Sequence, residues 1–342
     1  AEVVIYRARN VSYPLPSYIL KIYLSSIKAE KVAKKLALFD PFTAKERENL
    51  ALACGYLDKD HCYLLSRDTA ALIFEDYYFG DMAQILKVNN GLQKAHLLSL
   101  QHKKDIAREL LEALIRCHQK KIVHHDIKPS NIFFKRKQSR YIAAIGDFDD
   151  LLSPDILYRK IPTLLQSTFA KNPPVIEGNF LNRLEFFNNV LIPRLSHALL
   201  FGFPHTSYFV PLNLEGFLSN LLSKSAGVLE LKNAFVFDQT ESVEENKGFD
   251  FSKWARETVL VSDLVQIVMQ VSMLYDLSAM GLSLTCLFIE HNLLHSSAFS
   301  SNVRMQRAIH PVSQKTISSL QIHDTFYFKA LFIATGLTEE QA

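Results

Sequence analysis

Cysteine is scarce in this chain, and the few cysteines are too scattered to form a recognisable site. The four in 342 residues are Cys54, Cys62, Cys117 and Cys286. Their spacing matches neither a zinc-binding pattern nor a disulfide framework. We therefore expect small buried thiols in a reducing, intracellular and cytoplasmic setting rather than a secreted, disulfide-stabilised protein.

The chain also has little net charge and shows no secretion signal. Lys and Arg number 38 against 35 Asp and Glu, which gives a formal net charge of +3. This balance gives no reason to expect nucleic acid or an anionic membrane as the main partner. The first residues do not place a charged segment before an apolar run, so no signal peptide is predicted.

Long hydrophobic runs are rare, and residues 259–289 are the exception. The length and apolar character of this segment are those of a membrane span. However, Asp263, Asp276 and two glutamines between them interrupt it, and such groups are costly in hydrocarbon. We expect a central helix covered by protein, and no membrane span.

The pattern of apolar residues changes along the chain. Short β-branched and aromatic runs, separated by turn residues, dominate the first 80 residues and are typical of strands. From residue 97 onward, apolar residues recur at three- and four-residue steps, as in helices. The predicted strands are residues 2–9, 17–24, 61–68 and 69–76, with two more within 131–148. The strands 61–68 and 69–76 are expected to form a hairpin. The predicted helices are residues 26–39, 43–55 with Thr43 as N-cap, and 97–122.

Residues 124–131 read HHDIKPSN, and this stretch resembles the catalytic loop of protein kinases, His-Arg-Asp-Leu-Lys-Pro-x-Asn. The resemblance implies that Asp126 orients the attacking hydroxyl and that Asn131, five residues later, holds magnesium. Lys128 would neutralise charge on the transferred phosphoryl group. Lysine followed by Pro129 is more similar to serine/threonine kinases than to tyrosine kinases.

A second stretch, GDFDD at residues 146–150, is similar to the Asp-Phe-Gly motif of the same family. Asp147 would then be the main magnesium-binding carboxylate, which bridges the metal to the β- and γ-phosphates of ATP. Asp149 stands where the family has glycine, and a side chain restricts the backbone there. Its carboxylate leaves two readings open, a second metal ligand or an obstacle to the usual rearrangement of this motif.

The amino-terminal strands carry weaker similarities to the ATP-binding lobe. The stretch YILKIY makes Lys21 the candidate that binds the α- and β-phosphates. A helix glutamate should pair with it, and Glu46 is favoured over Glu48 within the predicted helix 43–55. The stretch LIFEDYY resembles the fifth strand and hinge. There Phe74 would be the gatekeeper, and the backbone of Glu75 and Tyr77 would face adenine.

Other family features are absent or altered. No Gly-rich phosphate-covering loop is visible, and His125 replaces an arginine that pairs with a phosphorylated activation loop in the family. We therefore do not expect control by such phosphorylation. The stretch SDLVQI suggests that Asp263 holds the backbone of the catalytic loop. Because 116 residues separate Asp263 from Asp147, residues 155–255 are expected to include an inserted element that binds a substrate or regulator.

Together these similarities imply an α+β, bilobal protein kinase-like fold with ATP and Mg²⁺ as cofactors. The N-lobe would be residues 1–76 and the mainly helical C-lobe residues 77–342. The implied function is transfer of the γ-phosphate of Mg-ATP to Ser/Thr hydroxyls of protein substrates. Two alternatives remain: a pseudokinase that acts as a scaffold or allosteric module, and a kinase-fold transferase with an unusual acceptor.

Overall fold

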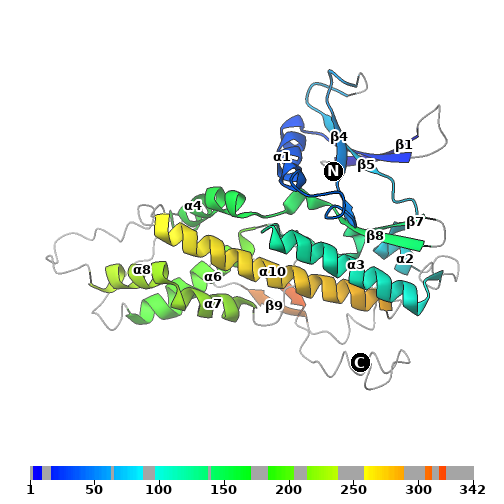
Figure 1. Cartoon of the computed structure of the whole chain (residues 1–342). Helices are drawn as coiled ribbons and strands as arrows, with labels where there is room; N and C mark the ends of the chain where they lie inside the picture. Colours follow the sequence, from blue (N-terminus) through cyan, green and yellow to red (C-terminus); the bar gives the residue numbers. More distant parts are fainter. Residues whose placement is uncertain are drawn as a thin grey trace.

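The structure, a computed structural model, describes residues 3–9, 17–62, 65–87, 97–137, 140–170, 184–203, 214–237, 258–288, 305–309 and 316–320. A strand-rich part, blue in Figure 1, lies above long helices that run across the view. The predicted α+β, bilobal architecture is confirmed, with a strand-rich N-lobe and a mainly helical C-lobe.

The N-lobe sheet contains four strands in the order β1-β2-β5-β4, with antiparallel neighbours throughout. The strands are β1 (Val3–Arg9), β2 (Ser17–Tyr23), β4 (Ala53–Leu57) and β5 (Ala70–Glu75). Lys21 sits on β2, paired in register with Ile5 on β1 and Leu72 on β5. Because side chains alternate along a strand, Lys21 and Tyr23 project from the same face of the sheet.

Helix α1 (Ser26–Leu36) follows β2 almost at once and confirms the predicted helix. The Ser25 hydroxyl accepts a hydrogen bond from the Lys28 amide and caps the helix. Its apolar face packs on the sheet in a cluster formed by Tyr23, Ala29, Val32, Ala70 and Leu72. The other end of α1 reaches the Phe148–Asp150 turn of the C-lobe.

The helix predicted over residues 43–55 is wrong. Thr43 and Glu46 form the expected cap, in which the Thr43 amide donates to the Glu46 carboxylate at 2.7 Å and the Glu46 amide donates to the Thr43 hydroxyl at 3.2 Å. The chain then continues in turns as far as Asn49, which has a φ of 65°. A short strand, β3 (Leu50–Ala51), and then β4 follow.

Tertiary contacts explain why this local helix signal fails. Leu50 and Ala51 pair with strand β8 (Arg140–Gly146) of the C-lobe. The Arg116 guanidinium donates hydrogen bonds to the carbonyls of Glu46 and Glu48, which a helix would have used internally. Context outside the segment thus outweighs its helix propensity.

The hairpin predicted over residues 61–76 is half right. Its second strand is β5, but the described residues of 61–68 form turns. The Asp58 carboxylate accepts hydrogen bonds from the amides of Asp60 and His61 and starts those turns. The hairpin partner of β5 is β4 instead.

A second sheet, in the order β3-β8-β7-β6, lies at the junction of the lobes. Its strands beyond β3 are β6 (Gly80–Asp81), β7 (Ile132–Lys137) and β8 (Arg140–Gly146). Strands β7 and β8 are the two predicted within 131–148, and β3 joins β8 in parallel. The short helix α2 (Met82–Leu86) follows β6. Because β8 ends at Gly146, it delivers Asp147 to the space beneath β2.

The C-lobe is built around two long helices, α3 (Leu100–Gln119) and α10 (Thr258–Phe288). Its other helices are α4 (Pro154–Ala170), a π-helical turn Phe187–Leu191 leading into α6 (Ile192–Phe201), α7 (Leu214–Lys224) and α8 (Ala226–Phe237). Helices α4, α7 and α8 pack on α10, and α6 packs on α4 and α7. The described helices of the predicted insertion therefore help to build the C-lobe core. Strands β9 (Met305–Ile309) and β10 (Thr316–Leu320) form an antiparallel pair.

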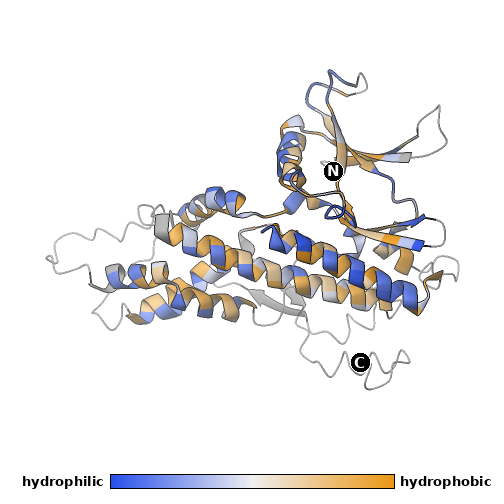
Figure 2. Cartoon of the chain, viewed as in Figure 1, coloured by the Kyte–Doolittle hydropathy of each residue, from blue (hydrophilic) through white to orange (hydrophobic). Residues whose placement is uncertain are grey.

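Helix α10 confirms the central helix predicted over residues 259–289. By length and composition, Leu260–Phe288 could cross a membrane, and 56% of its most apolar window is buried inside the protein. Figure 2 shows apolar residues along most of α10, whereas α3 has a distinct hydrophilic face. The contacts of α10 with α3, α4, α7 and α8 support the role of a core helix.

Candidate active site

Lys21 and two aspartates from the GDFDD stretch meet beneath the N-lobe sheet. The Lys21 ammonium lies 2.5 Å from Oδ1 of Asp147 and 2.9 Å from Oδ1 of Asp149. Two residues along β2, the Tyr23 hydroxyl donates to the Asp149 carboxylate, with its two oxygens at 2.9 and 3.1 Å. One face of β2 is thus bonded to the end of β8 across 126 residues of sequence.

The backbone around Asp147 is held in an uncommon conformation. Asp147 has a φ of 64°, in the left-handed region, and begins the 3-10 turn Phe148–Asp150. The Phe148 ring packs between Phe39 and His124, with ring centroids 4.9 and 4.6 Å away. Such a conformation persists only where the surroundings enforce it, and here the buried Phe148 does so.

The catalytic-loop residues form a compact hydrogen-bonded group. Lys128 Nζ lies 2.6 Å from Oδ2 of Asp126, and Asn131 Nδ2 donates to the same oxygen at 3.0 Å and to the Asp126 carbonyl at 2.8 Å. The spacing of Asp126, Lys128 and Asn131 in sequence therefore produces direct contacts.

His124 connects this loop to the GDFDD stretch. Its Nδ1 accepts a hydrogen bond from the Asp126 amide at 3.2 Å, and its Nε2 lies 2.8 Å from the Gly146 carbonyl. With Nδ1 as acceptor, Nε2 is the donor. The buried ring thus fixes the two motifs relative to each other.

Asp276, not Asp263, holds the backbone of the catalytic loop. Its fully buried carboxylate accepts hydrogen bonds from the amides of His124 at 2.7 Å and His125 at 2.8 Å. Asp263 instead accepts from the Ser225 hydroxyl and the Gly227 amide. The prediction failed because both aspartates interrupt the same apolar helix, and the stretch around Asp263 looked more like the family pattern.

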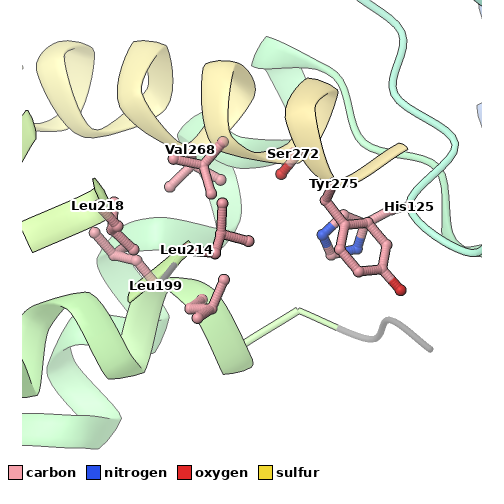
Figure 3. Close-up of a pocket in the computed structure, with 9 residues that line it drawn as sticks. His125, Leu199, Leu214, Leu218, Val268, Ser272 and Tyr275 are labelled. Atoms are coloured by element: carbon pink, nitrogen blue, oxygen red, sulfur yellow. The ribbon is translucent and has the colours of Figure 1, made fainter. Parts of the chain in front are cut away.

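His125 lies inside the C-lobe. It is buried, with a φ of 67°, and its ring packs on Tyr275 with centroids 5.5 Å apart. Figure 3 shows it at the edge of a cavity whose apolar walls include Leu199, Leu214 and Val268. This packing gives His125 a structural role beside α10, where the family has an arginine for a phosphorylated loop.

Lys21 and Asp147 each shift the pKa of the other towards its ionised form. Burial alone would raise the pKa of Asp147, but Lys21 and, more weakly, His124 and Lys128 hold it below its ordinary value. Burial would likewise lower the pKa of Lys21, yet Asp147 and Asp149 raise it. Burial, followed by the charge of Asp149, raises the pKa of Tyr23, so its hydroxyl keeps the proton that it donates.

Glu46 does not pair with Lys21. Its carboxylate caps Thr43 and lies 3.4 Å from the Lys120 ammonium of the C-lobe. Glu48 is exposed and lies in the same run of turns. The pairing required a helix at residues 43–55, whereas the helix that packs on the sheet is α1.

The hinge candidates lie at the end of β5. The Glu75 carboxylate is 2.7 Å from the Lys135 ammonium of β7, and that ammonium sits 4.8 Å from the centre of the Tyr77 ring. Phe74, the gatekeeper candidate, pairs in register with Ile19 on β2. Strand β5 therefore carries Phe74 and Glu75 to the edge of the second sheet, and Tyr77 follows it.

Three contributors to this site escaped the sequence analysis. Tyr23 and Lys35 contact Asp149, since the Lys35 ammonium donates to the Asp149 carbonyl, and Asp276 supports the loop. Tyr23 could have been found, because it lies two residues from Lys21 on one strand. Lys35 and Asp276 depend on how helices pack, which has no local signature.

Among the described residues, no group of three or more His, Cys, Asp or Glu is arranged to hold a metal ion. Asn131 and Asp147 nevertheless supply amide and carboxylate oxygens, the donors that magnesium prefers. Magnesium is commonly bound by one or two carboxylates together with substrate phosphates. The donor set therefore fits a metal that arrives with a nucleotide.

Comparison with known proteins gives the same family. The family model for the protein kinase domain matches residues 60–151. Wee1-like protein kinase 2-A of Xenopus laevis is 37% identical over 115 residues, which cover 33% of this chain and 20% of that protein. Human dual specificity tyrosine-phosphorylation-regulated kinase 3 is 32% identical over 99 residues, covering 29% and 16%.

The chain thus spans about a fifth of the length of the curated relatives it matches. The solved structure of the Cydia pomonella granulovirus kinase PK-1 aligns with 45% of this chain and 51% of its own, with a TM-score of 0.34 and 20% identity. The family-model match over residues 60–151 includes the catalytic-loop and GDFDD residues that the fold brings together. Residues 60–151 of the chain are therefore similar to the protein kinase domain.

Proposed function

We propose that the chain is a Mg-ATP-dependent protein kinase that transfers the γ-phosphate to Ser or Thr hydroxyls of protein substrates. The observation that carries the proposal is the 2.5 Å contact between the ammonium of Lys21 and the carboxylate of Asp147. Phosphoryl transfer in this family needs a phosphate-binding lysine and a metal-binding aspartate in one site. The similarity to protein kinases over residues 60–151 supports the same activity.

Asp126 is proposed to orient the acceptor hydroxyl and take its proton. Lys128 and Asn131 both bond its Oδ2, at 2.6 and 3.0 Å, so the carboxylate is fixed before a substrate arrives. Lys128 lies against the carboxylate proposed to take the acceptor's proton, which supports a position close to the transferred phosphate. Fixed charges that need no reorganisation are the main source of catalysis in such sites.

Lys21 is proposed to hold the α- and β-phosphates, and the backbone of Glu75 and Tyr77 to face adenine. Asn131 and Asp147 would hold the magnesium ion. The ion neutralises charge that develops on the β- and γ-phosphates. Because the Asn131 nitrogen already donates to Asp126, the oxygen of its amide is the atom left to accept a metal.

The test is incubation of the purified chain with magnesium, γ-labelled ATP and a generic protein substrate. Asp126→Asn and Asp147→Ala are expected to stay folded. Each should reduce the rate of label transfer by a factor of ~10³ or more, because both residues are proposed to act directly at the reacting groups. Analysis of the labelled amino acid then separates Ser/Thr from Tyr acceptors. Full activity of Asp147→Ala would contradict the proposal.

A pseudokinase scaffold is the second candidate, and one observation favours it. Lys21 forms ion pairs with both Asp147 and Asp149, so protein carboxylates already occupy the ammonium that would bind phosphate. Binding of Mg-ATP separates the two candidates, because an enzyme must bind it. Binding without transfer to protein would instead favour a kinase-fold transferase with an unusual acceptor.

The lobe boundary at residues 76 and 77, and partner binding by the segment 155–255, are proposals of the same kind. The change of sheet between β5, ending at Glu75, and β6, beginning at Gly80, supports the boundary. A reducing compartment inside a cell is a further proposal, supported by the scattered spacing of the four cysteines in the sequence.

A further inference from the structure

We propose that Asp149 is the anchoring partner of Lys21, in place of the helix glutamate that pairs with this lysine in other protein kinases. The role of Lys21 rests on the proposed function, whereas the anchoring itself rests on contacts within the chain. In protein kinases the lysine–glutamate pair joins a sheet strand to a helix and must form for activity. Here the pair joins β2 to the turn after β8.

Asp149 is held on every side by groups that suit this role. Lys21 lies 2.9 Å from its Oδ1, and the Tyr23 hydroxyl lies within 3.1 Å of both carboxylate oxygens. The Lys35 ammonium donates to its backbone carbonyl. The carboxylate is therefore fixed by two residues of one strand, and the backbone by the end of α1. The contacts give the unusual aspartate of the GDFDD stretch a specific structural use.

Helix α1 offers no carboxylate that would do the same. Its only acidic residue is Glu30, which is exposed and pairs with Lys34 at 2.7 Å on the helix surface. The residue that α1 directs to the site is Lys35. The helix therefore supplies a cation, and the turn after β8 supplies the carboxylate that a helix provides in other protein kinases.

Two carboxylates on Lys21 allow a division of roles. If Asp147 turns to a metal ion when a nucleotide binds, Lys21 loses its 2.5 Å partner and keeps Asp149. A buried ammonium without a carboxylate is costly. Asp149 would keep Lys21 paired and directed at the phosphates throughout, which glycine at this position cannot do.

A double-mutant cycle tests the anchoring without any nucleotide. Thermal midpoints are measured for Lys21→Met, Asp149→Asn and the double variant, with Asp150→Asn as the matched control on the same turn. The expected result is a double-variant shift clearly smaller than the sum of the single shifts, and additivity for the Asp150 pair. Additive shifts for Lys21 and Asp149 would overturn the proposal. Tyr23→Phe, which leaves the charges in place, is the second probe if Asp149→Asn fails to fold.

Calorimetric titration with Mg-ATP tests the consequence for the site. Asp149→Asn is expected to weaken ATP binding roughly tenfold, a 1.4 kcal/mol difference, and to have no further effect in the Lys21→Met background. Asp149→Glu should recover part of the affinity, since it restores the charge. Equal losses in both backgrounds would show that Asp149 acts independently of Lys21. Absence of ATP binding in the unmodified chain would refute the proposed function, while the thermal cycle would still decide the anchoring.

Discussion

His118 on α3 and Asp276 on α10 are 158 residues apart in sequence, yet the His118 Nε2 atom lies 3.1 Å from the Asp276 carboxylate. The same carboxylate accepts the amides of His124 and His125. One buried side chain therefore joins the two long helices of the C-lobe to the catalytic loop, and the loop geometry depends on it.

We predict that Asp276→Ala destabilises the chain more than any surface substitution. The change leaves two buried amides without an acceptor, which costs roughly 2–5 kcal/mol of unfolding free energy. Urea unfolding followed by circular dichroism measures the loss. Asp263→Ala, on the same helix but bonded to Ser225 and Gly227, is the matched control and should lose about 1–2 kcal/mol. Equal losses would contradict the role given to Asp276.

Asn49 should tolerate glycine better than alanine. Its φ of 65° is unfavourable for residues with a Cβ, and its Nδ2 atom donates to Glu109 at 3.2 Å and to the Ala143 carbonyl at 2.8 Å. Alanine would lose these hydrogen bonds and keep the backbone strain, which should lower the free energy of unfolding by about 2–4 kcal/mol. Glycine would also lose the bonds but would relieve about 1 kcal/mol of the backbone strain. Chemical denaturation of both variants measures the difference, and identical stabilities would argue against strain at this position.

The stability of the chain should depend on pH through Asp150. Burial raises its pKa above the ordinary value; Lys35 opposes this, while Asp126, Asp149 and Asp147 add to it. The folded state therefore holds this proton to higher pH than the unfolded state does. Its contribution to stability falls as pH rises from the unfolded to the folded pKa. Asp150→Asn should be more stable than the parent at pH 7, with a smaller gain at pH 3. Melting curves of both proteins between pH 3 and pH 7 measure the difference in stability. A stability gain of Asp150→Asn that increases as the pH falls would contradict this prediction.

Two glycine-to-alanine substitutions should act in opposite directions. A Cβ on Gly146 would lie 2.9 Å from the Ala51 Cβ and 2.7 Å from the Phe133 ring, whereas no atom lies within 4 Å of a Cβ on Gly281. Gly146→Ala should cost about 1–3 kcal/mol through overpacking. Gly281→Ala should gain about 0.5–1 kcal/mol, because alanine is the better helix residue. Unfolding midpoints test both, and a neutral Gly146→Ala would mean that β3 and β8 separate easily.

The sequence was most informative where function requires contiguous residues. The group formed by Asp126, Lys128 and Asn131 follows from six residues of sequence, and strands β7 and β8 follow from their apolar runs. Long-range partners could not be chosen in the same way. Asp263 and Asp276 are 13 residues apart, about 20 Å along a helix, and only the packing of α10 on α3 decides which one meets the loop.

In the segment at residues 43–55, by contrast, a correct local signal led to a wrong prediction of a helix. Thr43 was predicted correctly as a cap, since its hydroxyl accepts a hydrogen bond from the Glu46 amide. The helix nevertheless does not form, because β8 and Arg116 take up its backbone groups. A local sequence signal can specify a cap, but contacts in the assembled fold determine whether a helix continues from it.

The parallel pairing of Leu50 and Ala51 with β8 constrains how the lobes move. The lobes are also joined by the connection from Glu75 to Gly80. The hydrogen bonds from Arg116 to the carbonyls of Glu46 and Glu48 hold the same side of the junction. We therefore expect that any separation of Lys21 from Asp147 that keeps these contacts is a tilt of the N-lobe about the β3–β8 pairing.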